Sequence, residues 1–148
     1  MFKLVARTLA GILLMTLTGL SAAATFSNAT AITSPVGAGT SGTGPGVPYS
    51  PYPSAITVSG MTGTISKVTV TINNLSVDFP DDIVMVLVSP NGANLVIISD
   101  VGGNAAAASA TLTLDDAAAS QLPDNGPLAS GTFKPTAFNS GIVKDNFP

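Results

Sequence analysis

Aspartate is the residue type in this sequence that could do acid-base or metal chemistry. All eight acidic residues are aspartates, and the chain contains no histidine, cysteine, glutamate or tryptophan. A Ser-His-Asp or Cys-His relay therefore cannot be built from this chain, and neither can a zinc site that depends on imidazole or thiolate. We expect no enzymatic activity from the chain itself.

Most of the aspartates lie where the predicted strands end. Loops converge there, and carboxylates gathered in a loop could coordinate a hard cation such as Ca²⁺, which takes six to eight oxygen ligands. The candidate calcium ligands are Asp81, Asp82, Asp100, Asp115 and Asp116. Two alternatives stay open: the aspartates cap turns and keep an apolar chain soluble, or a pair of them does acid-base work of the glycosidase type. No other cofactor is expected.

The N-terminus has the composition of a secretory leader. Lys3 and Arg7 accompany an uncharged apolar run at residues 9–20, which is followed by small residues at 21–24. The run is shorter than the roughly 20 residues that span a bilayer, and no second long apolar run follows. We therefore predict a signal peptide at 1–24, no transmembrane segment after cleavage, and a secreted or cell-surface protein. The absence of cysteine favours a bacterial export route.

The predicted mature part is small and acidic. Removing residues 1–24 from the 148 leaves 124 residues, in which three lysines stand against eight aspartates, so the formal charge is −5 instead of the −3 of the whole chain. A chain of this length forms one compact domain at most. Its negative charge makes nucleic acid and anionic lipid unfavourable partners.

Turn residues and alternating apolar residues divide residues 25–148 into loops and strands. Residues 34–53 are a Gly/Pro-rich loop. Residues 37–42 match G-x-G-x-x-G there, but Pro45 and Pro48 follow where a nucleotide site needs a helix. Strands are predicted near 26–32, at 55–59 and, from the alternation of Lys67, Thr69 and Thr71 with valine and isoleucine, at 67–72.

The second half of the chain predicts a hairpin and one further strand. Residues 83–88 are continuously apolar, residues 89–92 (Ser-Pro-Asn-Gly) favour a tight turn, and residues 95–98 return as the partner strand. Because 83–88 is apolar on both faces, we expect it in the middle of a sandwich, covered on both sides. Residues 105–110 predict a loop that enters a strand at 111–114, residues 115–119 a single helical turn, and residues 123–148 no strand. The fold class is all-β, an antiparallel β-sandwich.

An ordered series of short motifs resembles one known family. The series comprises Pro-Tyr-Pro-Ser at 51–54, Gly-Thr-Ile-Ser-Lys-Val-Thr-Val-Thr at 63–71, Leu-Ser at 75–76, Phe-Pro-Asp-Asp-Ile at 79–83, Ser-Pro-Asn-Gly at 89–92, Ser-Asp-Val-Gly-Gly at 99–103 and Ser-Gly-Thr-Phe-Lys-Pro-Thr at 130–136. It is similar to bacterial P/Homo B domains, which accompany subtilisin-like proprotein convertases. The resemblance implies a jelly-roll sandwich at 25–148 that supports the folding, stability or contacts of a serine-type endopeptidase. A protease catalytic domain or a cell-surface ligand would be its partner.

Two departures from the family pattern keep a second hypothesis open. Relatives often have a further aspartate where this chain has Val84, and they usually close with a Gly-Thr-Trp type strand, whereas this sequence has no tryptophan and stops at Pro148. We therefore expect a sandwich that is incomplete at its C-terminus. The leader is also not followed by a protease domain. The alternative is an autonomous cell-surface or adhesion β-sandwich that binds carbohydrate or protein.

Overall fold

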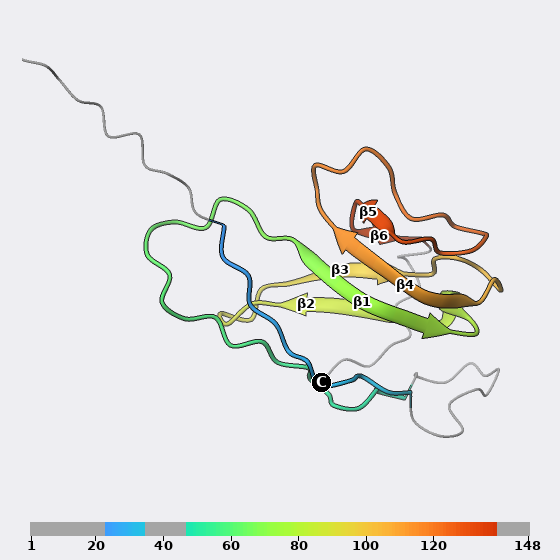
Figure 1. Ribbon diagram of the computed structural model, residues 1–148, viewed down its shortest axis with the longest axis horizontal. Helices are drawn as coiled ribbons and strands as arrows, with labels where there is room; N and C mark the ends of the chain where they lie inside the picture. Colours follow the sequence, from blue (N-terminus) through green and yellow to red (C-terminus); the bar gives the residue numbers. More distant parts are fainter. Residues whose placement is uncertain (1–22, 35–46, 139–148) are drawn as a thin grey trace, which may run out of the picture.

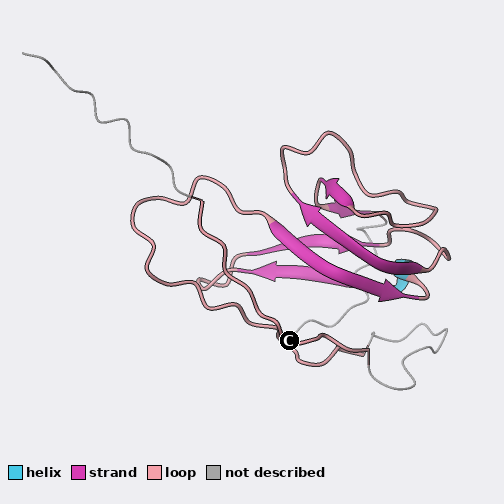
Figure 2. Cartoon of the chain, in the orientation of Figure 1, coloured by secondary structure: helices cyan, strands magenta, loops and turns pink. Residues whose placement is uncertain are grey.

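The protein is built from β-strands. A computed structural model describes residues 23–34 and 47–138. They form β1 (Val70–Val77), the short 3-10 helix η1 (Pro80–Asp82), β2 (Val84–Val88), β3 (Asn94–Ser99), β4 (Ala107–Leu114), β5 (Gly131–Phe133) and β6 (Thr136–Ala137) (Figure 2). The all-β prediction is confirmed, and within these residues no helix is long and apolar enough to cross a bilayer. Nearly all of the predicted leader, the glycine motif at 37–42 and the chain from residue 139 lie outside the described residues.

The strands make two mixed sheets of three strands each. One sheet has the order β1-β4-β5 and the other β2-β3-β6. The pairs β1–β4 and β2–β3 are antiparallel, whereas β5 runs parallel to β4 and β6 parallel to β3. The prediction of a purely antiparallel sandwich is therefore wrong for β5 and β6. Both come from the turn-rich segment in which no strand was expected, and strands of three and two residues are too short to show a period-two pattern.

The chain crosses repeatedly between the sheets, which ties them together (Figure 1). The last crossing is the shortest, because only Lys134 and Pro135 separate β5 from β6. The Lys134 N–H donates to the Ser120 carbonyl over 2.8 Å. Thr136, 1% exposed, donates its hydroxyl proton to the Lys134 carbonyl over 2.7 Å and accepts from the Leu122 N–H over 3.1 Å. The buried hydroxyl is therefore satisfied and holds the crossing in place.

One hydrophobic core serves both sheets. In β4, Ala110, Leu112 and Leu114 are buried, while Thr111 and Thr113 between them are only half-buried, as the alternating side chains of a strand require. The predicted strand at 111–114 is thus confirmed, but it begins at Ala107, so the prediction of a loop over 105–110 is wrong for its last four residues. Small alanine and serine side chains give no period-two pattern of apolar and polar residues there. The core cluster consists of Ile97, Ile98, Val101, Ala107, Ala110, Leu112, Leu114, Leu122 and Leu128.

The hairpin prediction is confirmed, but the position predicted for its first strand is wrong. The Gly92 N–H donates to the Ser89 carbonyl over 2.9 Å and closes the turn between β2 and β3. However, β2 is the outer strand of its sheet, and Leu87 and Val88 are 37% and 61% exposed. β3 is the central strand of this sheet instead. Both strands of the hairpin are apolar, and an apolar run does not show which of two such strands lies in the centre.

The two N-terminal strands that were predicted do not form. Near the first, only an isolated bridge pairs Thr33 with Ser50, and residues 55–59 belong to no strand. Ile56 and Val58 are more than half exposed, although they alternate with polar residues. β1 begins at Val70, three residues later than expected, and residues 47–69 run outside the two sheets before it (Figure 1). An alternating segment becomes a strand only when a partner strand accepts its hydrogen bonds.

Candidate functional site

Five aspartates gather at one end of the sheets, which we call the acidic end: Asp78, Asp81, Asp82, Asp100 and Asp124. The first three lie in the connection that leaves β1 and enters β2, two of them in η1. Asp100 follows Ser99, which pairs with the first residue of β2 and donates its hydroxyl proton to the Asp100 carboxylate. Asp124 is brought in by the next loop, because the Gly102 N–H donates to the Pro123 carbonyl over 2.8 Å.

Asp115 and Asp116 lie at the opposite end of the strands. They follow Leu114, the last residue of β4, which pairs with Val70 at the start of β1. Because β1 has eight residues, each adding about 3.3 Å, the two groups of aspartates are separated by about 20 Å or more. Calcium–oxygen distances are about 2.3–2.6 Å. The five predicted ligands therefore cannot form one site.

The aspartates at the acidic end do not converge on a single point either. Among residues 23–34 and 47–138, no three acidic side chains are arranged closely enough to hold one metal ion. The carboxylates nevertheless influence one another. Partial burial of the Asp81 carboxyl raises its pKa above the ordinary value, and the negative charges of Asp100, Asp82 and Asp124 raise it further. Repulsion between the carboxylates at the acidic end therefore lowers the stability of the folded state.

Asp81→Asn is expected to increase the free energy of unfolding at neutral pH. A folded-state pKa above the unfolded one means that ionised Asp81 destabilises the fold at pH values above both, and the penalty disappears as the pH falls below the unfolded-state pKa. The gain from the substitution should therefore shrink in acid. Urea titrations from pH 7 down to pH 3 measure it. Asp116→Asn, which removes the same charge at the other end, is the control; an equal gain there would mean that overall charge is responsible.

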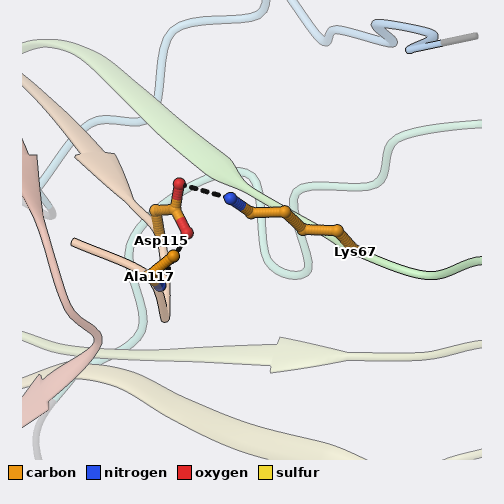
Figure 3. Close-up of polar contacts among 3 residues, drawn as sticks. All are labelled: Lys67, Asp115 and Ala117. Carbon is orange, nitrogen blue, oxygen red and sulfur yellow. Dashed lines mark hydrogen bonds and ion pairs between the residues drawn. The ribbon is translucent and has the colours of Figure 1, made fainter.

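Lys67 and Asp115 form an ion pair at the other end (Figure 3). The Lys67 Nζ donates to Asp115 Oδ2 over 2.7 Å, and the Ala117 N–H donates to Oδ1 over 2.8 Å. The Ala118 N–H donates to the Asp115 carbonyl over 2.9 Å, so the predicted turn at 115–119 forms, although as a turn without a helix. The hydrogen bond from Lys67, followed by that from Ala117, lowers the pKa of the Asp115 carboxyl below its ordinary value.

Lys67→Gln is expected to reduce stability slightly at neutral pH and not at all in strong acid. A depressed folded-state pKa stabilises the fold above the unfolded-state pKa, and this contribution is lost as the pH falls through the folded-state pKa. The Lys67 side chain is 52% exposed, so solvent screening keeps the effect small and added salt should diminish it. Thermal melts at both pH values measure the difference. Lys134→Gln removes the same charge at the same end from a lysine that is not the ion-pair partner of Asp115, and a matching pH dependence there would contradict the assignment.

An open apolar groove of about 500 Å³ lies between the sheets at the end that carries this ion pair. Its lining residues are Ile65, Ser66, Lys67, Val68, Val70, Leu87, Leu95, Ile97, Leu114, Asp116, Ala117 and Pro135. Ile65, Val68 and Leu95 are more than half exposed. None of the lining residues is aromatic, so the groove lacks a surface on which a sugar ring could stack, and it suits aliphatic side chains better.

The groove is the feature that the sequence analysis missed, whereas the aspartates were identified and the structure separates them into two groups at opposite ends of the strands. The sequence did contain a signal for the groove. Residues 83–88 and 95–98 are apolar throughout, whereas a strand with one buried face needs apolar residues only at every second position. No family model, no curated protein and no solved structure matches this chain. The similarity to P/Homo B domains rests on the ordered motifs of the sequence alone.

Proposed function

We propose that the chain is an exported, non-catalytic module of the P/Homo B type that works beside a subtilisin-like serine protease. Its role is to support the folding, stability or substrate contacts of that enzyme. The observation that carries the proposal is where the motifs fall in the fold. The motif at 79–83 contains η1, that at 89–92 is the β2–β3 turn, that at 99–103 leads out of β3, and that at 130–136 contains β5 and the start of β6.

Three of these four motifs lie at connections between strands, and the fourth contains β5 and the start of β6. A shared architecture predicts motifs at connections, because the geometry of a turn restricts the choice of residues more tightly than strand pairing does. Under this proposal the two sheets belong to a jelly-roll sandwich. The residue inventory supports a role without catalysis, since the sequence offers no histidine or cysteine. Lys67, the lysine nearest to a carboxylate among the described residues, is occupied by its ion pair. Contact with another protein is then the role that we propose for the fold.

The direct test uses a bacterial subtilisin-like protease whose own P domain has been deleted. The purified chain is mixed with that catalytic domain in equal amounts, with an unrelated β-sandwich as the control. We expect a complex in size-exclusion chromatography and a longer half-life of peptide hydrolysis on heating, whereas the chain alone cleaves nothing. If no complex forms and the half-life is unchanged, the proposal is wrong. Binding to intact bacterial cells without any protease complex would instead favour the autonomous surface protein.

Calcium stays a prediction, and we take Asp81, Asp82 and Asp100, which lie at the acidic end, as its candidate ligands. Binding would require these side chains to move together, since no three of them share a site in the described structure. We expect millimolar Ca²⁺ to raise the melting temperature relative to EDTA, because a ligand of the folded state stabilises by RT ln(1 + [L]/Kd). Asp82→Asn should remove the response and Asp116→Asn should keep it. Equal melting temperatures in Ca²⁺ and EDTA would end the calcium hypothesis.

A further inference from the structure

β2 forms one outer edge of its sheet. No described strand pairs with that edge, since the sheet order is β2-β3-β6. Its five residues, Val-Met-Val-Leu-Val, contain no charge, no proline and no glycine. Natural edge strands usually carry a lysine, a proline or another feature that prevents a further strand from adding. The register of β2 against β3 shifts between Met85 and Val86, but the strand still presents an uncharged apolar edge that no described strand occupies. Such an edge favours the addition of another strand.

Exposed apolar side chains continue from this edge into the groove. Val88 is 61% exposed at the end of β2. Its neighbour Leu87 pairs across the sheet with Leu95, and both of these leucines line the groove. Leu87 thus carries the apolar lining of the groove to the edge strand, while Val88, the next residue along β2, adds an exposed apolar side chain on the opposite face of the sheet. Exposed apolar surface on soluble proteins commonly marks sites of association.

The distribution of charge favours a particular orientation of whatever adds to β2. The five aspartates of the acidic end, which carry a formal charge of −5, lie beside the start of β2. At the other end the two described lysines balance Asp115 and Asp116; Lys134 lies there because it follows Phe133, which pairs with Leu114. An antiparallel second copy places its acidic end beside this neutral end, whereas a parallel copy would bring the two acidic ends together.

We propose that β2 pairs antiparallel with β2 of a second copy of this chain, so that two three-stranded sheets become one sheet of six strands. With Val86 at the centre of the pair, Asp82 of one copy lies opposite the uncharged Pro90 of the other, and no carboxylates face each other. Both copies use the same strand in this contact, so the interface is isologous with two-fold symmetry. It therefore closes into a dimer and does not propagate into a fibre. A foreign extended peptide is the other conceivable occupant, but β2 has no charged side chain to select one.

The test measures mass against concentration by sedimentation or light scattering on the full chain, in the processed form that a bacterial host yields. Val88→Lys introduces a charge on the edge at an exposed position. Val58→Lys makes the same substitution at a 56% exposed valine in the segment that belongs to no strand, and it is the matched control. We expect wild type and Val58→Lys to dimerise, and Val88→Lys to dimerise at least about tenfold more weakly, a change of about 1.4 kcal/mol.

Amide hydrogen exchange on the wild type gives a readout that requires no variant. The amides of residues 84–88 should exchange more slowly as the concentration rises, while those of residues 55–59 should not change. A wild-type mass of one chain at all concentrations overturns the proposal, as does a dimer that Val88→Lys leaves intact. The protein could also stay monomeric and show protection of the β2 amides only after an extended apolar peptide is added. That result would identify a foreign peptide as the occupant of the edge, and it would also overturn the proposal of a dimer. None of these outcomes depends on a protease partner.

Discussion

Leu112→Ala is expected to lower the free energy of unfolding by about 2–5 kcal/mol. Leu112 is 0% exposed, pairs with Ile72 in the middle of the β1–β4 ladder, and belongs to the core that both sheets share. Truncation leaves a cavity whose walls belong to both sheets, so the contacts that hold the sheets together are lost along with the apolar burial. Because single domains are stable by only about 5–15 kcal/mol, the loss is a large part of the total. Urea denaturation followed by circular dichroism measures it.

Leu95→Ala is the matched control, because it removes the same atoms from a leucine that is 51% exposed. Leu95 gives up little buried surface, so we expect a loss below about 1 kcal/mol. The ratio of the two losses reports whether the sheets bury a common core. Equal losses would show that Leu112 is no better covered than Leu95 and that the arrangement of the two sheets is wrong.

The parts of the fold that were predictable are those encoded by neighbouring residues. Thr111 and Leu112 begin an alternation that specifies a strand with one buried face, whatever lies across from it. The turn at 89–92 has proline and glycine at positions where turn geometry requires them, so the hairpin could be identified before its partner strands were known. Signals of this kind are complete within a few residues and need no knowledge of the rest of the chain.

The parts that were missed depend on contacts between distant residues. Ile56 and Val58 alternate as strand residues do, yet no described strand accepts them, and β5 and β6 form only because β4 and β3 lie beside them. The same reason explains why the sequence does not show which candidate calcium ligands lie close together. Asp115 and Asp100 both follow strands, but strand ends meet only when strand directions agree, and β4 ends opposite to the end of β3 at which Asp100 lies. Strand direction is a property of the whole topology.

The second large effect is expected at the connection that forms the acidic end. Gly102 adopts a φ of +80°, and a Cβ placed there would lie 3.1 Å from Leu128 Cγ and 3.1 Å from Pro80 Cβ. Gly102, Leu128 and Pro80 are all buried, so there is little room for adjustment. Gly102→Ala should therefore cost about 1–2 kcal/mol for the left-handed backbone and a further 1–3 kcal/mol or so for overpacking. Its N–H and carbonyl hold Pro123 and Gly126, so the strain also reaches the loop that carries Asp124.

Gly92→Ala separates the two causes, because Gly92 has nearly the same φ, +85°, with no atom within 4 Å of the added methyl group. It should show the backbone cost alone, about 1–2 kcal/mol. Urea titrations of the two variants and wild type give the difference, which measures how tightly η1, the β3–β4 connection and the loop at residues 122–128 pack together. If the two substitutions cost the same, these three segments are free to move apart. The acidic end would then be a set of independent loops, with no fixed geometry in which its aspartates could act together.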